Sequence, residues 1–522
     1  MKRAGGAFIL LSFLFITASS RQKFQISQPS VPMSIDTGAK GAAKYVLLVS
    51  ADGLSYPMIS KMMRSDRYPV LKHLIKQGSF RKVMTVFPSM TWVAHTTMVT
   101  GQYPRSHGII ANKWIERYKE YIRPVSADIT EPDRKKRTYT LYDLASRSGL
   151  KTAAINWPGT QKADTLTYNL PELLLGRYQS NRYVSKPLID LYNDYIKGSG
   201  EQAAPILYAN AENAKNLLKI IANSEGVELD LLVRDLVIQL IHQPEKKRPR
   251  LILAHFLASD HWKHLYGSSD RIESWALELL DSHIKHLVRA LKGAGIYHET
   301  AILITSDHGF VNVTRRVNLE ALFSGRGLIK IHKRIQTTLK KEKLAVINQG
   351  STAYIYLKPG VSQSFRKKAL QSVNLGKYSS CIEEIYEPAR YRELGLPVKT
   401  VKPSLRLRSG FHDGAPDFIV LAKPHCYFSS ARGKVIQKLR VSLDNYQGFH
   451  GYLPTHPYMK TFLIAHGAGI RRSSSPLPEV SLVDLAPTVA HLAGIDWPER
   501  WPGNNSQFLL DGRVMYDLLE NR

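Results

Sequence analysis

Short apolar runs alternate with amphipathic stretches along most of this chain. The runs that begin at Tyr45, Leu251 and Ala301 are apolar at nearly every position, as expected of strands covered on both faces of a sheet. Between such runs, apolar residues recur at intervals of three and four, for example within Tyr68–Gln77, which is typical of a helix with one buried face. The alternation predicts an α/β fold built on a doubly wound, mostly parallel sheet flanked by helices.

The same periodicities predict further elements and two insertions. We expect a mostly helical insertion at about 160–250 and a mixed one, with Lys- and Arg-rich turns, at about 310–445. Residues 44–522 then form a single domain that carries these insertions. The individual elements expected are helices over Thr91–Met98, Tyr139–Ser148, Ile206–Ala222, Leu229–His242, Glu273–Ala294 and Leu482–Leu492, and strands over Thr152–Asn156, Ala353–Leu357 and Met459–Ala465.

Acids, histidines and one hydroxyl stand where predicted strands end or a helix begins. In an open parallel sheet, ligand-binding groups collect beyond the carboxyl ends of the strands, so residues distant in the sequence are expected to meet there. A single Asp-Gly after a strand is more often a turn, but several such ends in one chain indicate a site. The metal-ligand candidates are Asp52, Thr91, Asp260, His264, Asp307, His308 and His450.

This set of side chains suits metal-assisted phosphate chemistry. Mixed carboxylate and imidazole ligation favours zinc, although manganese and iron accept the same ligand types. Two metals about 3.5–4 Å apart stabilise both the attacking and the leaving oxygen of an in-line displacement. The Thr91 hydroxyl is a weak nucleophile that metal coordination activates, and its place at a helix N-terminus directs backbone amides toward phosphate.

At the level of motifs, the chain resembles the nucleotide pyrophosphatase/phosphodiesterase family of the alkaline phosphatase superfamily. The motifs follow the order found in that family and span about residues 44 to 500. They are Val49–Gly53, Phe87–Thr91, Thr100–Asn112, Trp157–Gly159, Ser259–His264, Thr305–Gly309 and Gly448–Tyr452.

The resemblance implies an alkaline phosphatase-like fold and a two-zinc hydrolase of phosphodiester or pyrophosphate bonds in nucleotide-like substrates. Thr91 would attack phosphorus and form a phospho-threonine intermediate. The ligands of the zinc beside Thr91 would be Asp52, Thr91, Asp307 and His308, and those of the other zinc Asp260, His264 and His450.

Three further roles are implied for the substrate. Asn112 would donate its side-chain amide to a phosphate oxygen, Trp92 would stack on a nucleobase or another flat leaving group, and Trp157 with Pro158 would line the same pocket. Donors of the Asn112 kind are typically worth about 2.7–4 kcal/mol of transition-state stabilisation.

Other functions remain open from the sequence. Val93 and Ala94 replace a Pro-Asn pair that the family often has, which puts the preferred ester in doubt. A phosphomonoesterase, a lipid-headgroup phosphodiesterase and a phosphonate hydrolase share the same metal core. A basic nucleic-acid- or membrane-binding protein on a degenerate hydrolase fold is the alternative outside catalysis, but such a protein is expected to have lost a ligand. We interpret His255 as a core residue of its strand and His261 as a non-ligand neighbour of Asp260.

The balance of charge is strongly basic, with a formal net charge of +29. Basic clusters at Arg134–Arg137, Lys246–Arg250 and Lys340–Lys343 are each typical of a solvated loop. Together they favour anionic substrates, anionic surfaces or other polyanions. They lack the interleaved aromatic residues of a single-strand binder, so no dedicated nucleic-acid module is expected.

The N-terminus and the cysteines indicate the compartment. Residues 1–20 have the basic start, ten-residue apolar core and small residues of a signal peptide, and 21–43 form a flexible lead-in. A retained N-terminal anchor is the alternative. We expect a bacterial periplasmic or secreted enzyme, because two cysteines are few for an animal extracellular protein. Cys381 and Cys426 form either a disulfide or two buried thiols.

Overall fold

A computed structural model gives the fold of the chain. It describes residues 40–520 except 63, 117–120, 124–137, 162, 173–183, 200–225, 331–338, 340–341, 374, 400–410, 413, 431–432, 440–446, 476 and 498–509. The expected signal peptide, most of the lead-in, the Arg134–Arg137 cluster and the Ile206–Ala222 helix lie outside the described residues.

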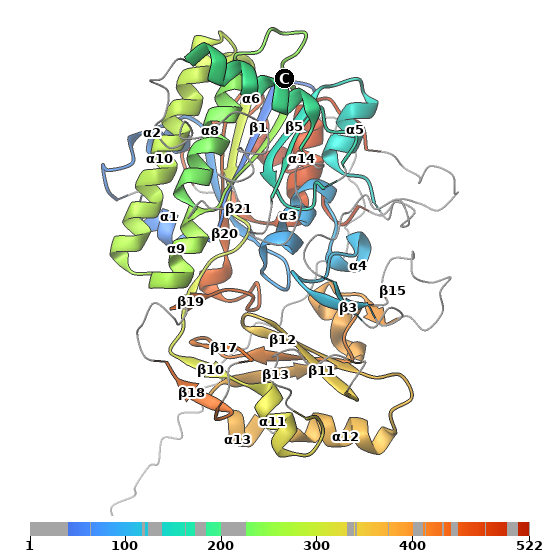
Figure 1. Cartoon of the computed structure of the whole chain (residues 1–522). Coiled ribbons are helices and arrows are strands. Elements are labelled where there is room, and N and C mark those ends of the chain that lie inside the picture. Colours follow the sequence, from blue (N-terminus) through green and yellow to red (C-terminus); the bar gives the residue numbers. More distant parts are fainter. Residues whose placement is uncertain are drawn as a thin grey trace, which may run out of the picture.

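An eight-stranded sheet forms the centre of the molecule (Figure 1). Only β20 runs against its two neighbours, and all other neighbouring strands are parallel. The predicted mostly parallel sheet is therefore confirmed. In spatial order the strands are β21 (Leu477–Ser481), β2 (Ser79–Met84), β20 (Thr461–Gly467), β8 (Thr300–Thr305), β1 (Tyr45–Ala51), β7 (Leu251–Phe256), β5 (Thr152–Trp157) and β6 (Tyr168–Pro171).

Helices cover both faces of this sheet, as the doubly wound prediction requires. One face packs against α1 (Tyr56–Met62), α2 (Pro69–Gln77), α6 (Lys186–Ser199), α8 (Val227–Ile241) and α10 (Asp270–Gly293). The other packs against α3 (Thr91–Thr100), α5 (Leu141–Arg147) and α14 (Leu485–Leu492). Strand β1 serves both layers because successive side chains alternate: Leu47 and Val49 belong to the first core, Val46 and Leu48 to the second.

A second lobe, built from residues after β8, lies below the main sheet in Figure 1. Its antiparallel sheet has the order β11 (Leu344–Gln349), β12 (Thr352–Leu357), β16 (Phe418–Ala422) and β13 (Ile382–Tyr386). A smaller sheet joins β17 (Cys426–Phe428), β10 (Arg315–Val317) and β18 (Ile436–Lys438), and the helices are α11 (Leu319–Gly325), α12 (Gln363–Ser372) and α13 (Leu375–Tyr378). Cys381 and Cys426 are disulfide-bonded inside this lobe, which decides between the two alternatives for the cysteines.

The expected elements that fall on described residues are present. Their ends shift by a few residues, and Leu482–Leu492 is a 3₁₀ turn over Leu482–Asp484 followed by α14. The 160–250 range also contains β6, the last strand of the main sheet, and α8, which packs against β7. Apart from 3₁₀ helices, the other short elements of the described residues are α4 (Pro104–His107), α9 (Ala258–Tyr266), β3 (Trp114–Glu116), β4 (Tyr121–Arg123), β9 (Val311–Asn312), β14 (Val398–Lys399), β15 (Phe411–His412) and β19 (Gly448–Phe449).

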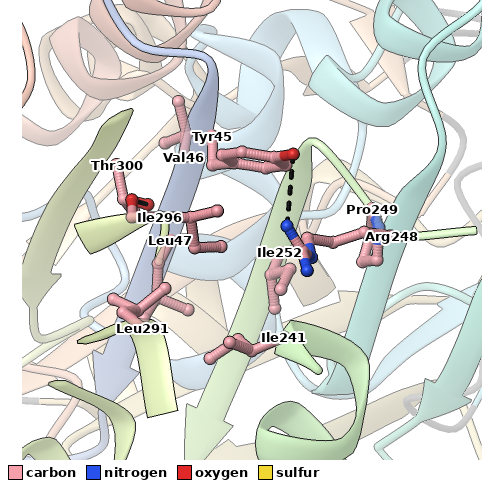
Figure 2. Close-up of a pocket in the computed structure, with 10 residues that line it drawn as sticks. All are labelled: Tyr45, Val46, Leu47, Ile241, Arg248, Pro249, Ile252, Leu291, Ile296 and Thr300. Carbon is pink, nitrogen blue, oxygen red and sulfur yellow. Dashed lines mark hydrogen bonds between the residues drawn. The ribbon is translucent and has the colours of Figure 1, made fainter. Parts of the chain in front are cut away.

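A small cavity lies at the amino ends of β1, β7 and β8 (Figure 2). Its 10 Å³ volume has room for about one water molecule, and its lining is mostly apolar. Arg248 donates to the Tyr45 hydroxyl at 3.4 Å across it. The cavity is therefore too small for substrate and lies at the sheet edge opposite to the predicted site. Of the helices that the structure describes, none has both the length and the apolar character needed to cross a membrane.

Candidate active site

Neighbouring parallel strands place two aspartates side by side. Asp52 follows β1 and Asp307 follows β8, and both carboxyl groups are fully buried. Gly53 donates its backbone N–H to Asp307 Oδ1 at 3.2 Å and has a φ of 72°. A Cβ at this glycine would lie 3.3 Å from Asp260 Cα. Glycine therefore lets the turn after β1 lie close to Asp260.

Helix α9 follows β7 and carries two more of the candidates. Asp260 lies in its first turn and His264 one turn later, so both point to the same side. His264 Nε2 is 3.4 Å from Asp260 Oδ2. The start of α9 has no cap of its own, but Asp230 of α8 accepts hydrogen bonds from Leu257 N at 2.7 Å and Ala258 N at 3.2 Å.

Asp230→Ala should therefore loosen the start of α9, although Asp230 itself is not one of the ligand candidates. The variant leaves the N–H groups of half-buried Leu257 and buried Ala258 unpaired, and we expect a loss of about 1–3 kcal/mol in the free energy of unfolding. Chemical denaturation measures this loss. Asp235→Ala, one turn further along α8, is the matched control because Asp235 pairs only with the adjacent Arg234 in the described structure. Equal stability of the two variants would contradict the capping role.

His450 and Thr91 complete the cluster from two other segments. His450 Nε2 lies 3.8 Å from Asp260 Oδ1. Thr91 is the first residue of α3, and its Oγ1 lies 3.3 Å from His308 Nε2. The same His308 nitrogen is 3.4 Å from Asp52 Oδ1, and the His308 and His450 rings stack at 3.8 Å.

The three histidines are oriented in the same way. Backbone carbonyl oxygens lie next to each Nδ1: Gly448 O at 3.0 Å from His264, Gly309 O at 3.1 Å from His308 and Ser89 O at 2.9 Å from His450. A carbonyl can only accept, so each Nδ1 carries the proton and each Nε2 offers its lone pair to the cluster. This is the usual arrangement of histidines that bind metal ions.

The carboxylates also fit a metal ion. Asp52 Oδ1, Asp260 Oδ1 and Asp307 Oδ2 are buried and accept no hydrogen bond within the described structure. Burial and the neighbouring Asp307 hold the pKa of Asp52 well above its usual range, and burial raises the pKa of Asp260 to about 6. Carboxyl groups without hydrogen-bond partners are buried close together here. Their burial costs free energy, which bound cations would offset.

Burial gives the histidines the protonation state that metal binding needs. It lowers the pKa of His308 and His450 to about 3 and that of His264 to about 4. All three imidazoles are therefore neutral at pH 7 and able to act as ligands.

Two ligand groups can be distinguished by distance. Asp260, His264 and His450 form one, and Asp52, Asp260 and His308 the other, with ligand atoms in each group within 4.8 Å of one another. Asp260 thus belongs to both groups, whereas the sequence assigns it to one metal. Asp307 joins the second group through His308, whose Nε2 is 3.1 Å from Asp307 Oδ2. All the ligand candidates therefore lie in one site.

The predicted substrate residues lie next to this cluster. Asn112 Oδ1 accepts from Trp92 N at 3.4 Å, which places the Asn112 amide at the start of α3. Trp92 is only 2% exposed, so its ring is not an open platform, and Trp157 is fully buried with its ring 4.9 Å from that of His95. Pro158 is also buried, directly after β5.

Two histidines that the sequence does not assign to the site contact it. His255 lies in β7, as expected, but its Nε2 is 3.0 Å from Asp52 Oδ2 and its Nδ1 is 3.0 Å from Asn156 O. Its register beside Ser50, two residues before Asp52, is the signal that distinguishes it from a core residue. His95 Nδ1 is 2.8 Å from Thr91 O, and its ring is 4.3 Å from that of His255.

A buried lysine adds positive charge behind the cluster. Lys263 donates from Nζ to Gly53 O at 2.9 Å, and burial lowers its pKa to about 8. It ties α9 to the turn after Asp52. His261, interpreted as a non-ligand, is absent from both ligand groups.

The family model for type I phosphodiesterase / nucleotide pyrophosphatase matches residues 46–453. Human ectonucleotide pyrophosphatase/phosphodiesterase family member 5 is 20% identical over 94% of this chain and 80% of its own. Human bis(5'-adenosyl)-triphosphatase ENPP4 is 22% identical over 86% of this chain and 78% of its own. A Schizosaccharomyces pombe protein described as an uncharacterized pyrophosphatase/phosphodiesterase is 21% identical, and the match spans 62% of this chain but 58% of that relative's length.

Solved structures give the same fold. Murine ectonucleotide pyrophosphatase/phosphodiesterase 5 superposes with a TM-score of 0.58 at 19% identity, over 91% of this chain and all of its own. An inactive form of the murine protein in complex with AMP gives the same TM-score at 18% identity and the same coverage. At these identities the likeness shows the alkaline phosphatase-like fold, which confirms the predicted fold class.

Proposed function

Because this chain belongs to the type I phosphodiesterase / nucleotide pyrophosphatase family, we propose that it is a two-zinc hydrolase of phosphodiester or pyrophosphate bonds that works through a phospho-threonine at Thr91. The observation that carries the proposal is the position of Thr91 Oγ1, 3.3 Å from His308 Nε2, at the first turn of α3 and beside two groups of buried ligands. Zinc ions bound there would supply Lewis-acid stabilisation of the phosphate oxygens and lower the pKa of the Thr91 hydroxyl.

The residues of the chain hold and orient the reacting groups. Thr91 Oγ1 attacks phosphorus, the ester bond opposite to it breaks, and the alcohol or nucleotide leaves. Water then cleaves the Thr91–phosphorus bond and restores the hydroxyl. The Oδ1 of Asn112 is held by Trp92 N, so its amide N–H groups are free to donate to a phosphate oxygen as charge develops.

Nucleotide-like esters are the proposed substrates. A flat organic group would lie near the start of α3, where Trp92 follows the nucleophile; because Trp92 and Trp157 are buried, their rings would support the site from within the fold and not as an open stacking surface. The AMP in the inactive murine relative supports a nucleotide ligand for this fold. A phosphomonoesterase and a lipid-headgroup phosphodiesterase are the alternatives within the same chemistry.

Initial rates on three substrates test the proposal. The zinc-loaded protein should hydrolyse p-nitrophenyl-thymidine monophosphate faster than bis-p-nitrophenyl phosphate, and p-nitrophenyl phosphate slowest. Preference for the monoester would instead assign a phosphatase. Absence of turnover on all three substrates would instead support the alternative function, a basic nucleic-acid- or membrane-binding protein.

Export of the enzyme is part of the proposal. The signal-like residues 1–20 and the Cys381–Cys426 disulfide both support a periplasmic or secreted location, because disulfides persist in oxidising compartments. We also propose that the basic surface attracts anionic substrates or polyanions. Lys246 and Lys247 are exposed, while Arg248 and Arg250 each lie 5.6 Å from the centre of the Tyr45 ring.

A further inference from the structure

A buried contact joins Asp52, a proposed metal ligand, to His255 of the neighbouring strand β7. In the parallel pairing of β1 with β7, Ser50 lies opposite His255, which places the imidazole beside the end of β1. His255 Nε2 is 3.0 Å from Asp52 Oδ2, and both side chains are fully buried. His255 itself is absent from both ligand groups. In the described structure it therefore reaches the proposed metal site through Asp52.

The two carboxyl oxygens of Asp52 have different surroundings. Oδ1 accepts no hydrogen bond within the described structure and lies 3.4 Å from His308 Nε2, whereas Oδ2 contacts His255. A hydrogen bond between Oδ2 and the imidazole places one proton between them, so Oδ1 is the oxygen left for a cation. The last torsion of an aspartate side chain is otherwise broad, and either oxygen could turn toward the metal site.

The imidazole of His255 is held in turn by Asn156. His255 Nδ1 is 3.0 Å from Asn156 O, which can only accept, and Asn156 Nδ2 donates to His255 O at 3.1 Å. Asn156 has a φ of 59°, a left-handed conformation that few residues other than glycine adopt. The pairing of β5 with β6 shifts register at this point, between Ile155 and Trp157. The irregular residue of β5 is thus the one whose carbonyl contacts the His255 ring, and such local strain is typical of functional sites.

Resting on the function proposed above, we propose that His255 is a positioning residue that fixes Asp52 with Oδ1 toward the metal ion, and that Asn156 fixes His255. Partners that orient a metal ligand in this way typically raise metal affinity about 10–100-fold. The effect should concern one metal of the two. It is the metal held by the group that contains Asp52, whose other members are Asp260 and His308.

Zinc affinity tests the inference without turnover. Competition with a chromophoric chelator on the full chain gives the dissociation constants of the two zinc equivalents. His255→Asn keeps an amide near Nδ1 for the Asn156 carbonyl but is too short to reach Asp52. One zinc equivalent should then bind about 10–100-fold more weakly. His255→Gln places its amide near Nε2, within reach of Asp52, and should stay within about threefold of the wild type.

Activity at two zinc concentrations gives a second readout. At limiting zinc, kcat of His255→Asn should fall together with the occupancy of the weakened site. Excess zinc should restore most of it, because Thr91 and the ligands themselves are unchanged. A residue that contacts the substrate would not be compensated by zinc in this way.

A buried histidine on the same strand's helix layer provides the control. His283 of α10 is 1% exposed, its ring lies 4.6 Å from that of Phe256 in β7, and it belongs to neither ligand group. His283→Asn should keep both zinc affinities of the wild type. If His255→Asn does not fold, His255→Met replaces it, because methionine has about the length of glutamine without the amide.

Two results would overturn the inference. One is wild-type zinc affinity in a folded His255→Asn or His255→Met protein. The other is equal weakening in His255→Gln and in the variant without the Asp52 contact, since that pattern belongs to packing alone. Two zinc equivalents that depend on His255 as expected, without hydrolysis of any diester, would support the role of His255 and contradict the proposed catalytic function.

Discussion

Thr91→Ala is expected to reduce the turnover of the preferred diester by at least about 10³-fold, because the variant has no oxygen to attack phosphorus. Thr91 is 8% exposed and lies at the start of α3, where alanine is compatible with the helix. Its hydroxyl contacts only His308 Nε2 in the described structure, so the fold and the metal content should change little. Steady-state kinetics, metal analysis and thermal unfolding of the same preparation measure the three quantities.

Two variants bracket this result. Thr91→Ser keeps the oxygen and should retain far more activity than the alanine variant. Thr97→Ala removes a hydroxyl from the same helix that lies 3.1 Å from His107 Nε2, away from the ligand groups, and reports the general effect of losing a buried hydroxyl. Thr91→Ala activity within tenfold of the wild type would exclude Thr91 as the nucleophile.

His450→Ala is expected to abolish both activity and the binding of one metal equivalent. His450 Nε2 belongs to the group with Asp260 and His264, and its Nδ1 is fixed by Ser89 O. Residues that only orient a ligand already cost about 10–100-fold in metal affinity when removed, so loss of a ligand should cost more than about 100-fold. Metal content after dialysis and kcat at limiting zinc measure the two losses.

A nearby histidine provides the matched control. His456 is half-buried and its Nδ1 accepts from Tyr458 N, but it belongs to neither ligand group. His456→Ala should keep the metal content and the kcat of the wild type. If His450→Ala kept its full metal complement while losing activity, the metal-ligand role of His450 would be wrong, and a direct contact with substrate would have to replace it.

The sequence is informative about the main sheet because the strands there are buried on both faces. A continuous apolar run that ends on a charged residue is unusual, and the parallel arrangement of β1, β7 and β8 brings those ends to one edge. For this reason the sequence alone is enough to group Asp52, Asp260 and Asp307. The direction of β20 could not be predicted, since an apolar run looks the same in either orientation.

Residues that act through a neighbouring strand are harder to recognise. His255 has an apolar sequence environment, and only its register beside β1 shows that it faces Asp52. The Cys381–Cys426 pair depends on the fold of the second lobe, which brings the residue before β13 to the first residue of β17 with 5.5 Å between their Cα atoms, and spacing alone does not specify this approach.

The stereochemical course at phosphorus tests the central claim most directly. The substrate is a nucleotide diester made chiral at phosphorus by one sulfur atom and by isotopes of oxygen. The zinc-loaded protein hydrolyses it, and the configuration at phosphorus in the product is determined. Two in-line displacements, first by Thr91 and then by water, each invert the centre, so the account predicts net retention. Net inversion would show a single direct attack by water and would contradict the phospho-threonine at Thr91.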